Sequence, residues 1–295
     1  MFTMIRFGLV SFLLFLLLCS TGLCAALPID LTGGMKPAAE AFKSDTHYED
    51  ASLTIDIETM EYNKTNCYVA RVKIQDPSQL RTAPAYSFER DQTAPANAIA
   101  ERVNAVLAIN GDYFSYQLQS GSYLIRQGTM YLNKPMFRRD VLLIDENGDF
   151  TIVKPYKSGD PREFDPKGEG IINSFNFGPG LIIDGERMDP EYFDSYHFSQ
   201  KKHRRCAICQ VEHGKLEYLC VVTDGPEENR EGGLDLQEFA DFICTLGVKY
   251  AYNLDGGNST VMLFGDRKVN AIDQKYLRPI SDIIYFATTV PEDKE

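Results

Sequence analysis

The chain has 295 residues, 44% of them hydrophobic, which is enough for one large domain with a substantial core. Its formal net charge is −12 at pH 7. This acidity argues against nucleic acid and anionic lipid as partners, because both attract basic proteins. A site for an anionic substrate must therefore obtain its positive potential from a few residues close to it.

The N-terminal residues 1–26 have the pattern of a signal peptide. Arg6 precedes an apolar run over residues 7–18, and small residues at 24–26 suit signal peptidase. The run is shorter than a comfortable membrane span. We therefore expect cleavage after residue 26, a secreted or cell-envelope protein, and no stable membrane insertion afterwards; an uncleaved membrane anchor is the alternative.

The remaining chain divides by composition into a lead-in and a domain. Residues 27–50 are polar and mixed, and we expect a loose lead-in to a single domain over residues 51–295. Apolar runs, mostly alternating with polar residues, predict single strands at residues 53–57, 68–74, 105–109 and 282–289. Pairs of such runs around a glycine-containing turn predict hairpins at residues 123–132, 141–153 and 205–223.

Two helices are predicted from apolar residues at helical spacing. The first covers residues 95–103 and begins with a proline suited to a first turn. The second has an apolar stripe over residues 236–243, with Asp235 as its cap and Gly247 just past its end. Because strands outnumber helices and hairpins dominate, we expect an α+β fold with a mixed, mainly antiparallel β-sheet core and a few flanking helices.

The cysteines do not form a disulfide framework, because five remain after the expected cleavage, an odd and sparse set. His203, Cys206, Cys209 and His213 have a spacing that suggests zinc. In a strand, however, the two cysteines point to opposite faces. We therefore expect no metal and no cofactor. A single disulfide between Cys206 and Cys220 across the hairpin stays open as an alternative.

Polar residues gather at four predicted strand or loop ends. These are residues 110–114, 176–180, 204–205 with 223–225, and 255–260. In the last segment an apolar run leads to Asp255 and a double-glycine turn. Adjacent glycines accept positive φ and leave room for a ligand close to the backbone. A carboxylate, such a turn and polar side chains are the components of a site for a charged, hydroxyl-rich ligand, although an ordinary hairpin turn has similar residues.

Seven stretches of the chain follow one another in the order of a known family. They are residues 108–114, 177–185, 205–208, 222–225, 233–240, 253–260 and 278–280, within roughly two thirds of the mature chain. The most specific is Leu254-Asp-Gly-Gly257 with the helix that precedes it. On these stretches the chain resembles the phosphodiester glycosidase family, which includes the lysosomal uncovering enzyme, an N-acetylglucosamine-1-phosphodiester alpha-N-acetylglucosaminidase. Asn258 stands where the family usually has a third glycine, and Cys206 and Cys209 replace its usual threonine and glycine.

The resemblance implies hydrolysis of the sugar–phosphate bond of a sugar-1-phosphodiester, for example in a surface polysaccharide, exopolysaccharide or other glycan. A phosphomonoester leaves as an anion, so the reaction needs a cation against the phosphate more than a strong general acid. Arg205 is predicted to bind the phosphate, because its fork matches two oxygens. Carboxylates then stabilise positive charge at the anomeric carbon or activate water.

The matched stretches supply the candidate site residues. The predicted catalytic carboxylates are Asp255, Asp224, Asp112 and Glu238. The predicted substrate-binding residues are Arg205, Asn110, Gly256, Gly257, Asn258, Ser259, Thr260 and Arg278. Glu238 has a second interpretation, because Asp235 and Glu238 also fit a capping box at the start of the helix.

Two other functions are compatible with the same residues. One is a non-catalytic domain that binds carbohydrate or polymer on this scaffold, since a fold does not fix a function. The other is a phosphodiesterase that cleaves the P–O bond, with Ca²⁺ or Mg²⁺ on the carboxylates.

Overall fold

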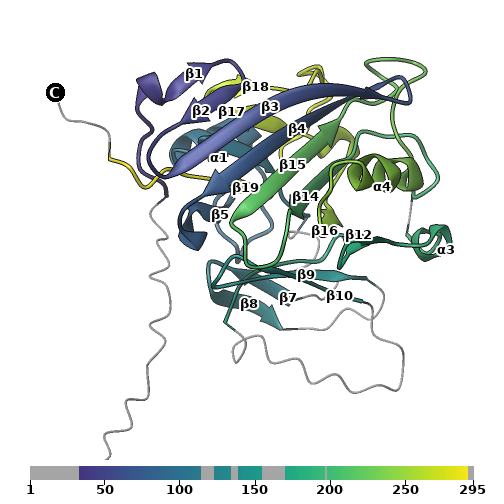
Figure 1. Ribbon diagram of the computed structural model, residues 1–295, viewed down its shortest axis with the longest axis horizontal. Coiled ribbons are helices and arrows are strands. Elements are labelled where there is room, and N and C mark those ends of the chain that lie inside the picture. The colour runs from purple at the N-terminus through teal and green to yellow at the C-terminus, as the bar shows by residue number, and fades with distance from the viewer. Residues whose placement is uncertain (1–32, 114–122, 134–138, 155–169, 197, 292–295) are drawn as a thin grey trace, which may run out of the picture.

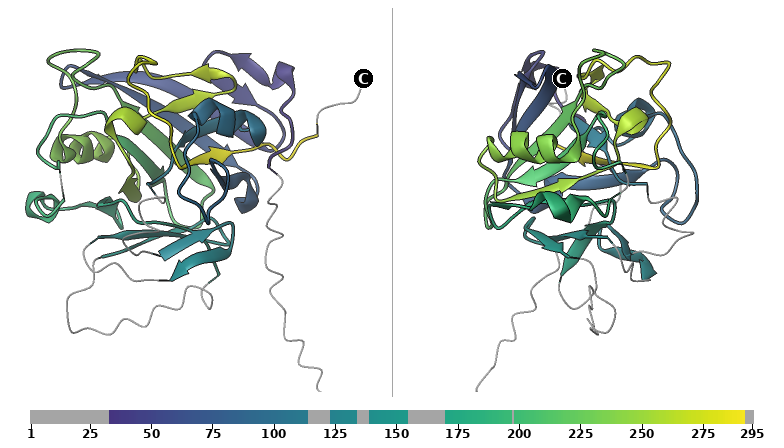
Figure 2. Two further views of the ribbon diagram at one scale, coloured as in Figure 1. Left: turned by 180° about the vertical axis from the view of Figure 1, so that it is seen from behind. Right: turned by 90° about the vertical axis from the view of Figure 1, so that its right-hand side faces the viewer.

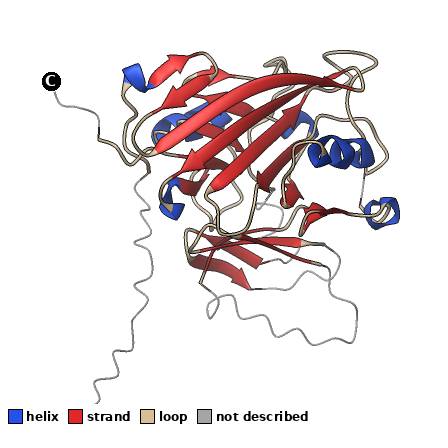
Figure 3. Ribbon diagram, in the orientation of Figure 1, coloured by secondary structure: helices blue, strands red, loops and turns tan. Residues whose placement is uncertain are grey.

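The computed structural model describes residues 33–113, 123–133, 139–154, 170–196 and 198–291, in which antiparallel sheets dominate (Figures 1 and 3). The long hairpin of β3 (Leu53–Tyr62) and β4 (Thr65–Ile74) shows how local sequence builds them. The first residues of β3 alternate between buried and more exposed side chains. Asn63 and Lys64 join the strands with φ of 47° and 61°, the conformation that a two-residue hairpin turn requires.

The largest sheet has nine strands. Its order is β1 (Phe42–Ser44), β2 (His47–Glu49), β3, β4, β15 (Glu217–Thr223), β14 (Cys206–Gln210), β16 (Tyr250–Asn253), β12 (Gly180–Ile183) and β13 (Glu186–Arg187). A second sheet has the order β18 (Arg267–Lys268), β17 (Met262–Phe264), β6 (Leu107–Asn110), β19 (Asp282–Phe286) and β5 (Leu80–Pro84). Smaller sheets are β10 (Phe150–Val153), β9 (Val141–Asp145) and β11 (Ile171–Phe175), and the pair β7 (Tyr123–Arg126) and β8 (Thr129–Asn133).

The two large sheets pack face to face around the main hydrophobic core. Ile55 and Ile208 of the nine-stranded sheet share this core with Ile109 and Ile284 of the second sheet. The opposite face of the nine-stranded sheet is covered by α4 (Leu236–Cys244) and α3 (Pro190–Phe193), which bury Phe239 there. The outer face of the second sheet is covered by α1 (Ala96–Arg102), as the view from behind in Figure 2 shows.

A local sequence signal fixes the start of α4. Asp235 caps α4 by accepting from the backbone N–H of Glu238, whose side chain accepts in return from the Asp235 N–H at 3.0 Å. Short 3₁₀ turns occur at η1 (Ala39–Ala41), η2 (Pro77–Gln79) and η3 (Gly257–Ser259). None of the helices in the described part of the chain is both long and apolar enough to span a bilayer.

The expected fold class is confirmed, since every strand pairing among the described residues is antiparallel and few helices flank the sheets. The expected loose lead-in needs correction for residues 39–49, because β2 pairs with β3 and begins the large sheet. Tyr48 explains this: its side chain is fully buried in the main core, which anchors a segment too short to show a clear pattern.

The cysteine pattern follows the predicted strand geometry. Cys206 packs in the core between the sheets and Cys209 in the core under α4, on opposite faces of β14. The alternative of a disulfide between Cys206 and Cys220 is not realised, and the five described cysteines are free. Register explains this, because Cys206 lies opposite Val222 and Cys220 opposite Ile208.

Candidate active site

A cavity of about 720 Å³ lies where ends of the two large sheets meet, a volume typical of small-molecule sites. Arg205 lines it just before β14, Asn253 at the end of β16, and Pro179 just before β12. The second sheet contributes Arg278 from the segment before β19, and Tyr113 from the loop after β6. Distant parts of the sequence therefore converge here, including most of the polar strand ends that the sequence singles out.

Asp255 is the carboxylate most closely held at this cavity. Its Oδ1 accepts from the N–H of Gly256 at 2.9 Å and its Oδ2 from Nη2 of Arg278 at 2.6 Å. Nδ2 of Asn110 donates to the backbone carbonyl of Asp255 at 2.7 Å and ties the segment to the end of β6. The side chain of Asp255 is 14% exposed and lines the cavity, so it is fixed in place and still accessible.

The double glycine after Asp255 is required by close backbone packing. A Cβ on Gly256 would lie 2.8 Å from the carbonyl oxygen of Arg204, and Gly257 has a φ of +59°. The N–H of Gly257 donates to the same Arg204 carbonyl at 3.0 Å. Both glycine amides are thus engaged inside the loop, so these residues shape the cavity rather than offering N–H groups to a substrate.

The three polar residues after the glycines have separate contacts. Oδ1 of Asn258 accepts from Nη1 of Arg204 at 2.9 Å. The hydroxyl of Ser259 accepts from Nε of Arg278 at 2.6 Å. Thr260 is buried, and its hydroxyl has no hydrogen-bond partner among the described residues. Asn258 alone of the three lines the cavity.

The two neighbouring arginines before β14 have different hydrogen-bond partners. Arg204 is buried, and its Nε and Nη2 pair with the two carboxylate oxygens of Glu228 at 2.9 and 2.6 Å. Arg205 instead donates from Nε to the carbonyl of Leu234 at 2.9 Å and from Nη2 to the carbonyls of Phe198, Ser199 and Lys201 at 3.0, 3.4 and 2.7 Å. Arg205 thereby holds the segment that borders the cavity.

This role limits what Arg205 can offer a phosphate. Nη1 is its one nitrogen that donates to no described residue, so a two-pronged fork is not available. Burial lowers the pKa of Arg205 to about 10, which leaves it charged at pH 7. The held segment includes Phe198 with a φ of +61°, an unusual conformation for a large side chain that costs about 1–3 kcal/mol.

The cavity carries an excess of positive charge. Five basic side chains line it, Arg139, Lys201, Arg204, Arg205 and Arg278, against the two carboxylates of Asp255 and Glu227. Within the described residues, Arg139, Lys201 and Arg205 form no ion pair with a carboxylate. In a chain with a net charge of −12, this is the local positive potential that an anionic ligand requires.

Family membership is decided by a match along most of this region. The phosphodiester glycosidase family model matches residues 103–287, which include all the segments just described around the cavity. The chain belongs to the phosphodiester glycosidase family. No curated protein sequence matches the chain.

Solved structures share the fold of this chain. The catalytic domain of zebrafish N-acetylglucosamine-1-phosphodiester alpha-N-acetylglucosaminidase is similar with a TM-score of 0.61 at 19% identity, covering 88% of this chain and 89% of that one. A Burkholderia pseudomallei K96243 protein has a TM-score of 0.55 at 14% identity and coverages of 76% and 74%. A Synechocystis protein has a TM-score of 0.51 at 18% identity and coverages of 79% and 62%.

Asp112 lies behind the cavity rather than in its wall. It is buried, and its Oδ1 accepts from Nη2 of Arg126 at 2.8 Å. The same guanidinium donates to Oδ2 of Asp282 at 3.0 and 3.1 Å, and Oδ2 of Asp112 accepts from the N–H of Asn176. The Asp112–Arg126–Asp282 cluster therefore joins β6, β7, β19 and the end of β11 beneath the site.

Two further carboxylates that the sequence analysis predicts to be catalytic lie outside the cavity. Asp224 accepts from Asn66 and Tyr68 at 3.1 Å each, and it lines a separate cavity of about 300 Å³. Glu238 forms the capping box of α4 and pairs with Lys202. The capping-box interpretation of Glu238 is confirmed, and neither side chain lines the cavity that holds Asp255.

Several residues that line the cavity were given no role in substrate binding by the sequence analysis. Arg139 donates from Nη1 to the carbonyl of Phe177 at 3.0 Å, and its guanidinium lies 5.5 Å from the Tyr113 ring centroid. Lys201 and His203 lie on an irregular segment, and burial, then Arg205 and Lys201, lower the pKa of His203. No periodicity marks residues in such loops. Lys201 and His203 are close in sequence to Arg204, and Arg139 has no signal beyond its charge.

Proposed function

We propose that this protein is a secreted hydrolase that cleaves the sugar–phosphate bond of a sugar-1-phosphodiester in a glycan or surface polysaccharide. The observation that carries the proposal is the charge of the cavity. Cations without a carboxylate partner in the described residues surround one firmly held carboxylate, Asp255, although the chain as a whole is acidic. Family membership supports the same reaction class.

The proposed phosphate position lies among Arg139, Lys201 and Arg205. Each has at least one N–H that donates to no described residue, and together they place three positive charges in the cavity wall. A phosphate monoester is then stabilised as it leaves with the electron pair of the broken C–O bond. These residues replace the single bidentate arginine that the sequence suggested.

Asp255 is the proposed catalytic carboxylate. As the C–O bond breaks, positive charge develops at the anomeric carbon, and a fixed carboxylate close by stabilises it or takes a proton from the attacking water. The hydrogen bonds from Arg278 and Gly256 keep both oxygens in place without removing the side chain from the cavity. Asn110 is proposed as a positioning residue, because its contact is with the Asp255 backbone.

The test is a screen of purified mature protein against sugar-1-phosphodiesters in water labelled with heavy oxygen. Label in the released sugar shows C–O cleavage and supports the proposal. Label in the phosphate shows a phosphodiesterase and contradicts it, as does saturable binding without turnover. A parallel incubation with a chelator separates the two enzymes further, because we expect sugar release to continue without a divalent ion.

The proposed secretion has its own test. It rests on the apolar run over residues 7–18 and the small residues at 24–26, which lie outside the described residues. N-terminal sequencing of exported protein should give a chain that begins at Leu27. A retained Met1, or a lipid on Cys24, contradicts this proposal.

A further inference from the structure

His203 places an imidazole in the wall of the cavity that holds Asp255. Its backbone is fixed, because its N–H donates to the carbonyl of Leu234 at 3.1 Å and its own carbonyl accepts from the Leu234 N–H at 3.1 Å. Leu234 is fully buried, and its carbonyl also accepts from Nε of Arg205 at 2.9 Å. The imidazole is therefore attached to a backbone position that the core holds in place.

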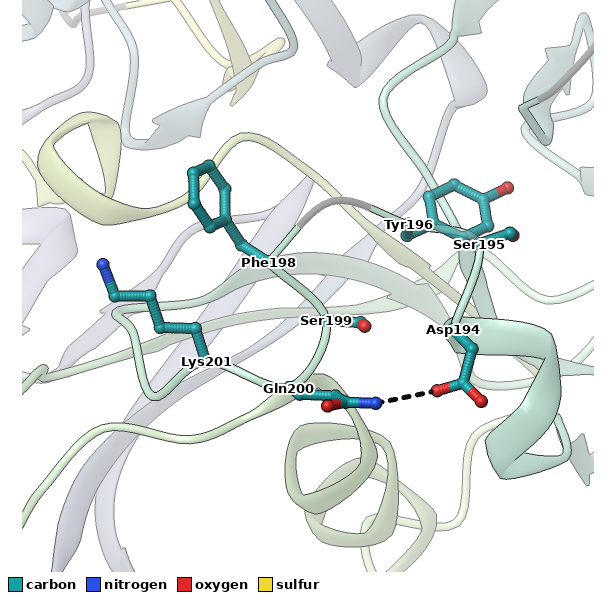
Figure 4. Close-up of a pocket in the computed structure, with 7 residues that line it drawn as sticks. All are labelled: Asp194, Ser195, Tyr196, Phe198, Ser199, Gln200 and Lys201. Carbon is teal, nitrogen blue, oxygen red and sulfur yellow. Dashed lines mark hydrogen bonds between the residues drawn. The ribbon is translucent and has the colours of Figure 1, made fainter.

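The imidazole of His203 keeps its hydrogen-bonding capacity for a ligand. Its ring meets the ring of Phe198 edge-on at 5.6 Å between centroids, and neither ring nitrogen hydrogen bonds to a described residue. Figure 4 shows that Phe198 and Lys201 turn away from Gln200, which donates to Asp194 at 3.3 Å. Phe198 and Lys201 line the same cavity as His203, so the imidazole lies among groups that face a substrate.

The charges around His203 make it a neutral base at pH 7. Burial lowers its pKa below the ordinary value of 6.5, the positive charges of Arg205, Lys201 and Arg204 lower it further, and Glu227 opposes them. The ring is then uncharged at pH 7, with one nitrogen that accepts a proton. An imidazole in this state can deprotonate a water molecule bound in the cavity.

Asp255 is better suited to act on the anomeric carbon than on water. Both of its oxygens already accept hydrogen bonds, from the N–H of Gly256 and from Nη2 of Arg278, and these contacts fix the carboxylate in one orientation. Glu227, the second carboxylate of the cavity wall, is 41% exposed and pairs with Arg204 at 3.3 Å. The wall thus offers one fixed carboxylate and one neutral imidazole, where most glycosidases have two carboxylates.

We propose that His203 is the catalytic base of a two-step reaction in which Asp255 is the nucleophile. The proposal rests on the function proposed above. In the first step an oxygen of Asp255 bonds to the anomeric carbon, and the C–O bond to the phosphate breaks and leaves its electron pair on the phosphate. In the second step water bonds to this carbon and His203 takes its proton, while the electron pair of the Asp255–sugar bond returns to the carboxylate. His203 then releases the proton to solvent.

The neighbours of His203 decide which step it serves. Lys201 and Arg205 lie two residues before and after it in the chain, and both charges act on its imidazole. The imidazole is therefore on the side of the proposed phosphate position. A phosphate monoester leaves without a strong general acid, so the first step needs no proton from this side. Water then takes the place of the phosphate next to the imidazole, and the sugar is released with the anomeric configuration of the substrate.

The experiment follows the release of methyl phosphate from the methyl ester of a sugar 1-phosphate. His203→Gln keeps a polar side chain but removes the base. We expect a rapid release of about one methyl phosphate per active site, followed by a steady-state kcat that is about a hundred- to ten-thousandfold below the wild-type value. The value of kcat/KM should change little, because it reports only the steps up to the release of the phosphate.

Azide provides a readout that a structural role of His203 would not change. An anionic nucleophile needs no base, so azide should restore turnover of His203→Gln and give a glycosyl azide with the configuration of the substrate. The matched control is His213→Gln, at a 62% exposed histidine outside the cavity, which should keep the wild-type kcat. NMR of the sugar first released by the wild type tests the expected configuration without any substitution.

The outcomes separate this inference from the proposed function. Sugar released by the wild type with inverted configuration, or a His203→Gln protein with the wild-type kcat, overturns the base and leaves the function standing. An equal fall of kcat and kcat/KM without the rapid first release also overturns the base, since it places the effect of His203 before the phosphate leaves. A wild type that turns over no sugar-1-phosphodiester overturns the proposed function and this inference with it.

Discussion

A single guanidinium, that of Arg278, holds Asp255 at the cavity: Nη2 donates to Oδ2 of Asp255 at 2.6 Å. Its Nε donates to the hydroxyl of Ser259 at 2.6 Å, so the segment before β19 is joined to both sides of the double-glycine turn. The Arg278 side chain is 55% exposed and that of Asp255 14%. The contact therefore contributes little to stability, and its main effect is to orient the carboxylate.

Asp255→Asn should reduce turnover far more than binding. The amide is nearly isosteric with the carboxylate but carries no charge and is no base, so it cannot stabilise the anomeric carbon or activate water. We expect kcat to fall about a hundred- to ten-thousandfold, the usual range for a lost acid–base group. Steady-state kinetics on a sugar-1-phosphodiester provide the measurement, with a thermal melt of each variant alongside.

The matched control is Asp273→Asn, which removes an exposed carboxylate near Arg278 in sequence and outside the cavity. It should keep full activity. A wild-type kcat for Asp255→Asn, or a loss that follows unfolding in the melt, removes Asp255 from the mechanism.

Arg205→Lys and Lys201→Gln should separate structural from electrostatic roles. The single nitrogen of lysine cannot replace all the contacts that Nε and Nη2 of Arg205 make with four backbone carbonyls, and a hydrogen bond from a charged group contributes about 1.5–3 kcal/mol. Arg205→Lys should therefore lower the free energy of unfolding by about 2–4 kcal/mol, seen in urea denaturation. Lys201→Gln should leave that free energy unchanged and raise KM about tenfold at low salt, with a smaller effect at high salt.

Other results would contradict the structural role of Arg205 or the phosphate-binding role of Lys201. An Arg205→Lys protein that unfolds like wild type but binds substrate poorly assigns the phosphate to Arg205 alone. If the KM of Lys201→Gln equals that of the wild type at both low and high salt, Lys201 does not bind the phosphate.

The strands and helices were largely predictable because their signals are local. Alternation identified β3 and β4, turn residues identified the hairpins of β7 with β8 and β9 with β10, and Asp235 marked the start of α4. The short strands β1 and β2 were missed, since three residues are too few for a period to show. Their position depends on Tyr48 reaching a core built by distant segments.

The site was predictable to the level of segments and not of side-chain roles. The turn at Asp255 and the arginines before β14 do meet at one cavity, because antiparallel pairing brings the start of β14 to the end of β16. At a strand end, however, successive side chains turn to opposite faces. The sequence therefore did not reveal that Asp224 faces Tyr68, or that Arg205 faces backbone carbonyls while Arg204 faces Glu228.

Glu228→Gln should be strongly destabilising. Glu228 is the bidentate partner of Arg204, whose side chain is only 1% exposed, so the substitution leaves a buried positive charge with one remaining carboxylate, that of Glu227 at 3.3 Å, which is 41% exposed. We expect a loss of about 3–5 kcal/mol in the free energy of unfolding by urea denaturation. Glu231→Gln on the same loop is the control, because Glu231 and its partner Lys64 are 70% and 66% exposed, and its effect should stay below about 1 kcal/mol. Equal effects of the two substitutions would show that the Arg204 pair contributes no more than a surface contact.

The raised pKa of Asp282 leads us to expect that the stability of the protein depends on pH. It is fully buried, and burial raises its pKa from 3.8 to about 8; Arg126 opposes the rise and Asp112 adds to it. Its Oδ1 accepts no hydrogen bond from the described residues, and it faces the backbone of Gly111, where a Cβ would lie only 2.4 Å away. Burying the neutral, protonated carboxyl group in this position costs less free energy than burying the carboxylate.

The sign follows from the protons bound in each state. Between pH 4 and pH 8 the folded protein keeps the proton on Asp282 and the unfolded chain has lost it, so stability falls as pH rises, by at most about 1.4 kcal/mol per pH unit. Asp282→Asn places an uncharged amide there, with its oxygen towards Arg126, and should flatten the profile of unfolding free energy between pH 5 and pH 8. Asp45→Asn, at an exposed carboxylate with an 86% accessible side chain, should keep the wild-type slope. If Asp282→Asn keeps that slope as well, the proton resides elsewhere in the Asp112–Arg126–Asp282 cluster or the aspartate is charged in the folded state.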